Sequence, residues 1–173
     1  MIRVQVIDEA RKQDLALPNE PFPIYGRLIP RLEDGIWSYE TRLLPPEEVT
    51  SLCFPDETYQ LSEQKVFMGA YEGETCVGLA VLEDAWFRYL YLADLKVSAA
   101  WRRKGAGQVL IRAALETAKA RGYGGVYTIA QDNNLDACRF YLAQGFRIGG
   151  FDNQVYTGTS QAGKADLYFY LDL

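Results

Sequence analysis

Apolar and polar residues alternate along much of the chain from residue 65 onward, in the period of β-strands. The alternation predicts strands at Val66–Tyr71, Cys76–Leu82 and Tyr89–Val97, the first two joined by a hairpin turn. It returns near the end of the chain, where it predicts two closing strands at Arg147–Phe151 and Ala165–Leu171.

Two segments between these strands change to helical spacing. The first follows a basic, glycine-containing loop at Arg102–Gly107 and is capped by Gly122. A short apolar run at Gly125–Ala130 then predicts a buried strand, and a second helix at Asn134–Gln144 is ended by Gly145. The apolar face of the first helix comprises Val109, Leu110, Ala113, Ala114 and Ala118.

The first 64 residues are less regular. A proline-rich stretch at Pro18–Pro23 predicts an extended entry, and Ile24–Leu32 and Ile36–Leu43 are predicted strands joined by a turn at Glu33–Gly35. We expect short helical pieces in the acidic segment Pro45–Gln64. An antiparallel meander followed by strand–helix–strand–helix–strand predicts a mixed α/β sheet, and the absence of repeats and linkers predicts one domain.

The composition excludes several kinds of chemistry. The chain of 173 residues has no histidine, so a Ser-His-Asp hydrolase and a histidine-bearing metal site are excluded. Cys53, Cys76 and Cys138 are too far apart to predict a disulfide framework or a zinc site, and no metal is expected. The N-terminus does not have the pattern of a signal peptide and no apolar run is long enough to span a membrane, so we expect a cytoplasmic protein.

Charge is unevenly distributed. Residues 1–84 carry 7 lysines and arginines against 16 aspartates and glutamates, whereas residues 85–173 carry 11 against 7. A cationic acceptor for the first part and an anionic donor for the second would fit this asymmetry, as would a solvated acidic surface. The net charge of −5 argues against nucleic-acid binding.

The basic loop has the features of an anion site. A strand ends at Val97, and a helix begins on two closely spaced glycines, Gly105 and Gly107. The first amides of a helix have no intrahelical acceptor, and they carry partial positive charge from the helix dipole. Nothing matches a Walker A loop, and Leu110 replaces the third glycine of a dinucleotide fingerprint. The cations of this loop are Arg102, Arg103 and Lys104.

Two motifs together resemble the GNAT acetyltransferase family. Its donor motif, Q/R-x-x-G-x-G/A, is matched from Arg102 to Gly107, and its later motif, N-x-x-A-x-x-(aromatic)-Y-x-x-x-G-F, is matched from Asn134 to Phe146. The chain is also similar to the streptothricin acetyltransferases within that family. The stretches that carry this likeness are Glu20–Phe22, Ile29–Arg31, Gly35–Trp37, Gln131–Leu135, Asp136–Tyr141 and Tyr168–Tyr170.

The resemblance implies an α/β (α+β) GNAT fold, with a mixed, mostly antiparallel sheet whose central parallel strands splay apart between flanking helices. It also implies three parts of one domain: an acceptor side at residues 1–64, an acetyl-CoA-binding core at 65–150 and closing strands at 151–173. The activity implied is N-acetyl transfer from acetyl-CoA to an amine of a cationic small molecule such as streptothricin, which would confer antibiotic resistance.

The resemblance further implies site residues. Tyr141, with the phenolic pKa near 10, would protonate the departing thiolate, and Asn134 would hold the pantetheine arm. The strand at Asp94–Val97 would bulge, and Asp94 is the first choice of general base. Ala93 stands where the streptothricin acetyltransferases typically carry a glutamate. The remaining expected donor-site residues are Leu95, Lys96, Val97, Arg102, Arg103, Lys104, Gly105, Ala106, Gly107 and Gln108, and the expected acceptor residues are Glu83, Asp84 and Asp94.

Two alternatives stay open at this point. The acceptor could be another amine, namely a polyamine, an aminoglycoside, or a lysine or N-terminus of a protein. The chain could instead be a non-catalytic acyl-CoA-binding module, although Asn134 and Tyr141 argue against it. The oligomeric state, a homodimer among the options, is left open. Cys138 has no base to activate it, so we expect direct transfer without an acyl-enzyme.

Overall fold

The computed structural model describes residues 1–173, which divide into two compact units. Strand β9 (Gly125–Gln131) passes from the first unit into the second. The single domain and its three expected parts stay predictions. The first unit comprises Met1–Glu20, Phe54–Tyr127 and Asp172–Leu173, and the second comprises Pro21–Cys53 and Thr128–Leu171.

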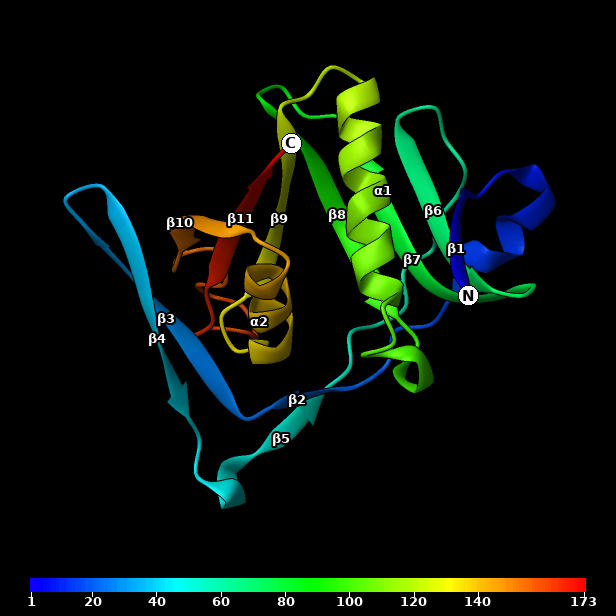
Figure 1. The fold of residues 1–173 in the computed structure, drawn as a ribbon. Helices are drawn as coiled ribbons and strands as arrows, with labels where there is room; N and C mark the ends of the chain where they lie inside the picture. Colours follow the sequence, from blue (N-terminus) through cyan, green and yellow to red (C-terminus); the bar gives the residue numbers. More distant parts are fainter. The chain divides into compact units, whose positions relative to one another are not determined.

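The first unit is built on a sheet with the strand order β1-β6-β7-β8-β9 (Figure 1). Neighbouring strands from β1 to β8 are antiparallel, and β8 and β9 form a parallel pair. Four of these strands, β6 to β9, are the predicted ones, each within one residue at either end. The strands are β1 (Ile2–Val6), β6 (Lys65–Glu72), β7 (Thr75–Glu83) and β8 (Tyr89–Val97).

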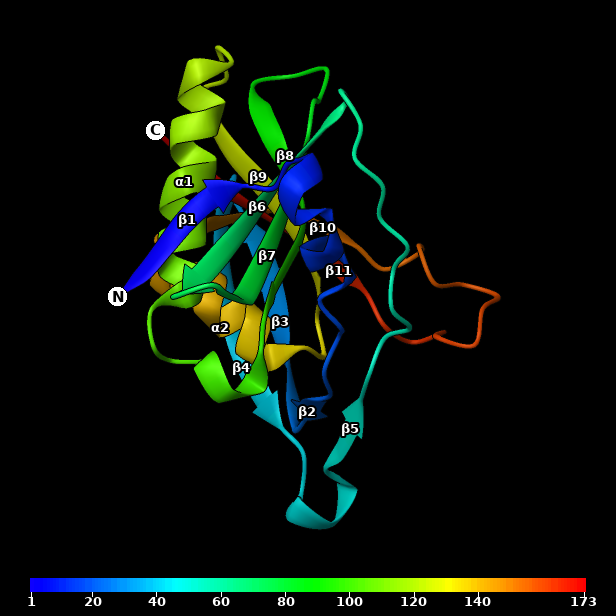
Figure 2. The same cartoon turned by 90° about the vertical axis from the view of Figure 1, so that its right-hand side faces the viewer.

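The two faces of this sheet are covered by different elements (Figure 2). Helix α1 (Ala106–Ala120) packs on one face, where a Cβ at Gly78 would lie 3.2 Å from a methyl group of Leu110. The 3₁₀ helix η1 (Glu9–Ala16) covers the other face, and its Leu15 joins a buried cluster with Leu79. The remaining buried members of this cluster are Ile7, Phe67 and Val81. Neither β1 nor η1 was predicted from the sequence.

Both α-helices end as predicted, on a glycine with a left-handed backbone. Gly122 has a φ of 84°, and the amides of Gly122 and Tyr123 donate to Lys119 O and Ala118 O. This pair of bonds is a Schellman motif, which satisfies carbonyls that would otherwise lack partners. Gly145, with a φ of 94°, ends α2 (Leu135–Ala143) in the same way.

The second unit contains the rest of β9, followed in the sheet order by β11 (Asp166–Asp172) and β10 (Arg147–Asp152). Helix α2 contacts β3, and Asp136 of α2 accepts a hydrogen bond from the hydroxyl of Tyr25 at 2.5 Å. Two small sheets complete the unit. They are the hairpin of β3 (Gly26–Glu33) with β4 (Ile36–Leu43), and β2 (Phe22–Ile24) with β5 (Thr50–Leu52).

Two expectations for the first 64 residues are corrected. The strand predicted at Ile24–Leu32 begins at Gly26, because Ile24 belongs to β2. The helical pieces predicted in Pro45–Gln64 reduce to one 3₁₀ turn, η2 (Pro46–Glu48), and most of the segment is irregular. The segment has prolines and few apolar residues to form a helical stripe, so side-chain hydrogen bonds rather than a helix hold it.

The fold class predicted from the sequence is confirmed: a mixed, mostly antiparallel sheet with one parallel pair, flanked by helices. The splay of that pair stays a prediction. None of the helices is both long enough and apolar enough to cross a membrane.

The cluster beneath η1 generates a stability prediction. Leu79→Ala removes a side chain that is 0% exposed, so we expect a loss of about 2–5 kcal/mol in the free energy of unfolding. Leu32→Ala is the matched control, because Leu32 is 55% exposed and its truncation should change stability by less than about 0.5 kcal/mol. Urea denaturation of both variants measures the difference, and equal losses would contradict the assigned core.

Candidate active site

Where strands β7 and β8 pair, residues 91–97 of β8 lie opposite residues 78–83 of β7, so β8 has one residue more in the paired stretch. Leu92 lies opposite Leu82 and Asp94 lies opposite Val81, so Ala93 is an extra residue in the ladder. This is a β-bulge, which reverses the alternation of side chains beyond it. The bulge was expected within Asp94–Val97, and the structure places it one residue earlier, at Ala93.

The bulge decides which face of the sheet carries the charged residues. In a regular strand Asp94 would share a face with Leu90 and Leu92, which are buried. Since cross-strand partners share a face, Asp94 instead lies on the side of Val81, and Lys96 lies on the side of Leu79. Both charges thus reach the face covered by η1, at the edge of its apolar cluster.

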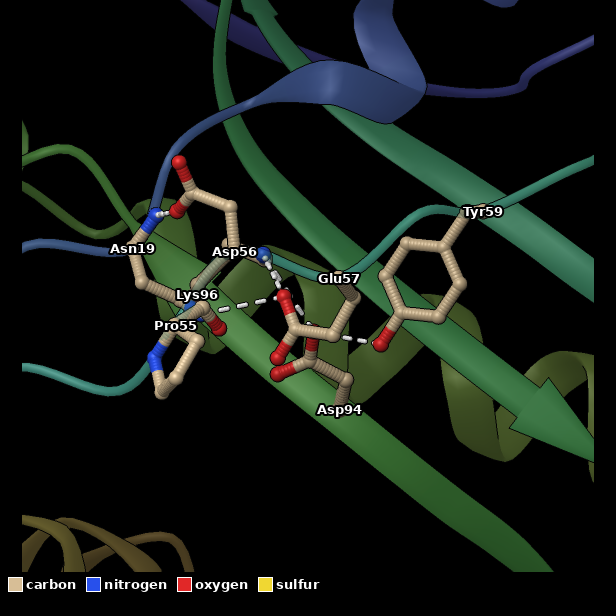
Figure 3. A network of polar contacts seen from close by, with 7 residues as sticks. All are labelled: Asn19, Pro55, Asp56, Glu57, Tyr59, Asp94 and Lys96. Carbon is tan, nitrogen blue, oxygen red and sulfur yellow. Dashed lines mark hydrogen bonds and ion pairs between the residues drawn. The ribbon is translucent and has the colours of Figure 1, made fainter.

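Asp94 and Lys96 meet polar side chains from the irregular segment that follows β5 (Figure 3). The Tyr59 hydroxyl donates a hydrogen bond to Asp94 Oδ2 at 2.8 Å. The Lys96 ammonium lies 2.8 Å from Glu57 Oε2 and 3.5 Å from Asp94 Oδ2. The Lys96 side chain is only 10% exposed, so its two carboxylate partners supply the compensation that a buried charge requires. We call Glu57, Tyr59, Asp94 and Lys96 the polar cluster.

Asn19 ties the irregular segment in place. Its side-chain amide donates to Glu57 Oε2 and to the carbonyl of Pro55, both at 3.0 Å. Its backbone amide donates to Asp56 Oδ1 at 2.7 Å (Figure 3). The segment therefore has a defined position over β8 although it contains no regular element there.

The polar cluster perturbs the proton affinity of its members. Burial raises the pKa of Asp94, an effect that Lys96 and the Tyr59 hydrogen bond oppose only in part. Burial acts in the same direction on Glu57, but hydrogen bonds from Lys96 and Asn19 outweigh it, and the pKa of Glu57 is lowered. Burial and the neighbouring Asp94 raise the pKa of Tyr59, which therefore stays protonated as a donor. A carboxylate with raised pKa is suited to act as a general base near neutral pH.

The loop before α1 has the backbone of an anion site. Arg103 and Gly105 adopt left-handed conformations, with φ of 60° and 91°, and Gly105 is the N-cap of the helix. The amide of Val109 donates the first intrahelical hydrogen bond, to Gly105 O at 3.1 Å. The amides of residues 106–108 precede it and can donate to a ligand. Successive amides in this arrangement form a concave site for an anion.

The surroundings of this loop fit a phosphate group. A Cβ added at Gly105 would meet no atom within 4 Å, so the space in front of the helix start is open. The 3₁₀ turn η3 (Ala99–Trp101) ends at Trp101, and the ammonium of Lys104 lies 4.9 Å from the centre of the Trp101 ring. Arg102 donates from Nε to Val97 O at 3.3 Å. Main-chain donors and fixed cations are what the pyrophosphate of coenzyme A requires.

The second unit holds the other expected donor-site residues, on α2. Asn134 is the N-cap of this helix, and its Oδ1 accepts from the amide of Ala137 at 3.2 Å. Tyr141 is 7% exposed, and its ring packs against three phenylalanines, with centroids 5.3 to 5.6 Å apart. The phenylalanines are Phe140, Phe146 and Phe169.

Just before α2, the chain has buried acceptors that the protein does not satisfy. Gln131 Oε1 and Asn133 Oδ1 are buried without a hydrogen-bond partner in the structure. Their neighbour Asp132 is different, because its Oδ1 accepts from the amide of Ala165 at 3.1 Å and its Oδ2 lies 3.7 Å from Arg27. Unsatisfied acceptors are expected where a ligand supplies the donors.

Glu83 and Asp84, the other residues expected to face the acceptor, have partners in the first unit. Glu83 forms an ion pair with Lys65 at 3.0 Å. Asp84 lies 2.9 Å from Arg121 and accepts a hydrogen bond from the Tyr123 hydroxyl. Cys138 in the second unit is fully buried, and burial raises its pKa to about 12, so it is not a nucleophile at neutral pH.

The structure therefore gathers Asp94 and Lys96 with two residues that the sequence did not single out, Glu57 and Tyr59. These two lie in the segment where helix was expected, and no motif marks them. Lys96 was predicted as a donor-site residue, whereas its side chain pairs with both carboxylates of the polar cluster. The roles of all these residues stay predictions.

Comparison with known proteins gives this arrangement a family. Residues 30–146, more than half of the chain, match the acetyltransferase (GNAT) family model. The chain belongs to the GNAT acetyltransferase family, so the predicted family and enzyme class are confirmed.

Within this family, the chain is similar over nearly its whole length to proteins named streptothricin acetyltransferase. The chain is 32% identical to streptothricin acetyltransferase A of Bacillus subtilis over 91% of its own length and 92% of that protein. It is 26% identical to a streptothricin acetyltransferase of Escherichia coli, with 98% and 95% covered. A solved structure of a Bacillus anthracis protein provisionally named streptothricin acetyltransferase, in complex with acetyl-coenzyme A, superposes over both full chains with a TM-score of 0.87 and 26% identity.

The anion site generates a binding prediction. Gly105→Glu places a side chain and a negative charge in the space before α1, so the gain in Tm that acetyl-CoA should give the wild type is expected to disappear. Gly73→Glu is the control, because Gly73 also has a left-handed backbone, with a φ of 58°, and open space around it. Differential scanning fluorimetry compares the three proteins, and a normal Tm gain in Gly105→Glu would refute the donor site.

Proposed function

We propose that the chain transfers the acetyl group of acetyl-CoA to a primary amine of a cationic small molecule, with streptothricin as the first candidate. The observation that carries this proposal is the extent of the similarity to streptothricin acetyltransferases, which covers 91% of the chain. The similarity thus includes residues before the polar cluster as well as the anion site. Inactivation of the antibiotic would follow from acetylation of its amine.

The donor would be held mainly by backbone. The amides at the start of α1, with Arg102, Arg103 and Lys104 beside them, would bind the pyrophosphate. Leu95 and Val97 would pair with the pantetheine arm in the manner of an added strand, and an amide near Lys96 or Val97 would polarise the acyl oxygen. The side-chain amide of Asn134 would hydrogen-bond the same arm.

Two side chains would move protons. Acetyl-CoA supplies the thioester, whose carbon–sulfur bond breaks as the carbon–nitrogen bond forms. Asp94 would accept one proton from the ammonium of the acceptor, directly or through water, which exposes the nitrogen lone pair. Tyr141 would donate its proton to the departing sulfur. As the amide forms, the nitrogen loses a second proton, and this proton would return to Tyr141. One proton is released to solvent overall, through Asp94.

The face around Asp94 is suited to a cation. Tyr91 lies opposite Glu83, so the bulge places Tyr91 and Asp94 on one side of the sheet. The ring of Tyr91 stacks on Tyr127 with centroids 4.7 Å apart, and both rings are half-buried. Aromatic rings and carboxylates side by side attract ammonium and guanidinium groups. These residues support a multiply cationic acceptor over a neutral amine.

A panel of amines tests the proposal. Release of free thiol from acetyl-CoA is measured with streptothricin, spermidine, an aminoglycoside and a lysine peptide at equal concentration. We expect streptothricin to have the highest kcat/KM. Preference for another amine would overturn the substrate and leave the acetyltransferase class intact, and absence of turnover with every amine would favour an acyl-CoA-binding module.

Tyr141→Phe tests the proposed acid. The substitution keeps the ring among its three phenylalanine neighbours and removes the proton, so kcat should fall by about 10–1000-fold while acetyl-CoA affinity is retained. Tyr39→Phe is the control, because Tyr39 is half-exposed on β4. Steady-state kinetics and a binding titration separate the two quantities, and an unchanged kcat would leave Tyr141 with a packing role only.

A further inference from the structure

The surroundings of Asp94 in the first unit comprise charged and titratable groups from four segments. Tyr59 and Glu57 approach from the irregular segment, and Lys96 comes from the same strand. Glu83 on β7 and Lys65 on β6 also belong to this set, since Glu83 acts electrostatically on Tyr59 and Lys65 lies 5.9 Å from the centre of its ring. Tyr91 of β8 lies on the same side of the sheet. The hydroxyl of Tyr59 donates a hydrogen bond to Asp94.

We propose that Tyr59 is a positioning residue for the acetyl transfer: its hydroxyl holds the Asp94 carboxylate toward the acceptor, while Glu57 binds Lys96 and keeps it from neutralising that carboxylate. This inference rests on the proposed role of Asp94 as the base. It assigns part of the active site to the segment after Cys53, which carries no recognisable motif.

The ring of Tyr59 is fixed from several sides, so its hydroxyl has a defined direction. Phe67 packs edge-on against it with centroids 5.5 Å apart, and the ring borders the buried cluster beneath η1. Lys96 lies 5.7 Å from the ring centre. A phenol anchored by its ring and donating at its tip restricts the carboxylate to a narrow range of orientations.

Lys96 contacts two carboxylates at unequal distances, and this explains why Asp94 can still accept a proton. The ammonium lies 2.8 Å from Glu57 but 3.5 Å from Asp94, and Asn19 donates to the same oxygen of Glu57. Glu57 is therefore the main counter-charge of Lys96. A base that formed the shorter ion pair would have a lowered pKa and would accept a proton from the acceptor less readily.

The two partners should shift the pH dependence in opposite directions. Tyr59→Phe removes a hydrogen bond that favours the charged carboxylate, so the pKa of Asp94 rises and the acid limb of kcat moves to higher pH. Glu57→Gln removes a nearby negative charge and makes Asp94 the only carboxylate partner of Lys96. The pKa of Asp94 therefore falls, and the acid limb of kcat moves to lower pH. We expect about one pH unit in each case.

The experiment records kcat against pH at saturating acceptor for the wild type, Tyr59→Phe, Glu57→Gln and Asp94→Asn. Tyr71→Phe is the matched control, because Tyr71 is a buried tyrosine of the same unit whose hydroxyl donates to Asp14 at 2.7 Å, away from the polar cluster. Its acid limb should coincide with that of the wild type. Thermal melting checks that each variant is folded.

Opposite shifts in Tyr59→Phe and Glu57→Gln would support the inference. If Asp94→Asn lowers kcat at neutral pH but Tyr59→Phe leaves the acid limb in place, Tyr59 has a structural role and the inference is overturned while the proposed base stands. If Asp94→Asn has the rate and pH profile of the wild type, the proposed base itself is wrong. Should Tyr59→Phe fail to fold, the Glu57→Gln variant decides: a shift of its acid limb to lower pH supports the inference, and no shift or a shift to higher pH overturns it.

Discussion

A single extra residue in β8 determines which face of the sheet carries the charged side chains of this strand. The bulge at Ala93 separates Leu90 and Leu92, which face α1, from Asp94 and Lys96, which face the side of η1. Without it, two charges would point into the helix-covered core, at a cost of several kcal/mol each. The bulge is therefore the constraint on which the polar cluster, the aromatic pair beside it and the proposed base all depend.

Asp94 and Lys96 are largely buried and need polar partners. These partners come from the irregular segment after Cys53, which contains neither helix nor strand. Asn19 and Glu57 are joined by a hydrogen bond, and Glu57 in turn holds Lys96. An irregular segment can follow the outline of such a cluster residue by residue, which a helix with a fixed period cannot do. The absence of regular structure after Cys53 is thus consistent with a role in the site.

The sequence predicted those features that arise from short-range rules. Gly122 and Gly145 stop helices because the backbone there is left-handed, and Gly105 starts one for the same reason, so glycine spacing located all three. Strands β6, β7 and β8 were evident from alternation. The signal for β1 was also present, because Ile2–Val6 alternates strictly between apolar and polar residues, but it was overlooked. η1 escaped prediction because a 3₁₀ helix does not follow the 3.6-residue repeat.

The cluster itself could not be predicted from spacing. Tyr59 and Asp94 are 35 residues apart, and nothing local marks a tyrosine in an acidic, proline-interrupted stretch as the partner of a strand carboxylate. The contact exists because η1 and the irregular segment fold onto one face of the sheet. Such long-range pairings are set by tertiary packing and carry no local signature.

The same cluster also gives a physical meaning to Ala93. The streptothricin acetyltransferases that the chain resembles typically carry a glutamate beside the aspartate of this strand, whereas Ala93 packs against the apolar cluster beneath η1. A second carboxylate nevertheless reaches the site, because Glu57 arrives from the irregular segment at 2.8 Å from Lys96. The chain thus has two carboxylates around one lysine, of which Asp94, the proposed base, is the one on the strand.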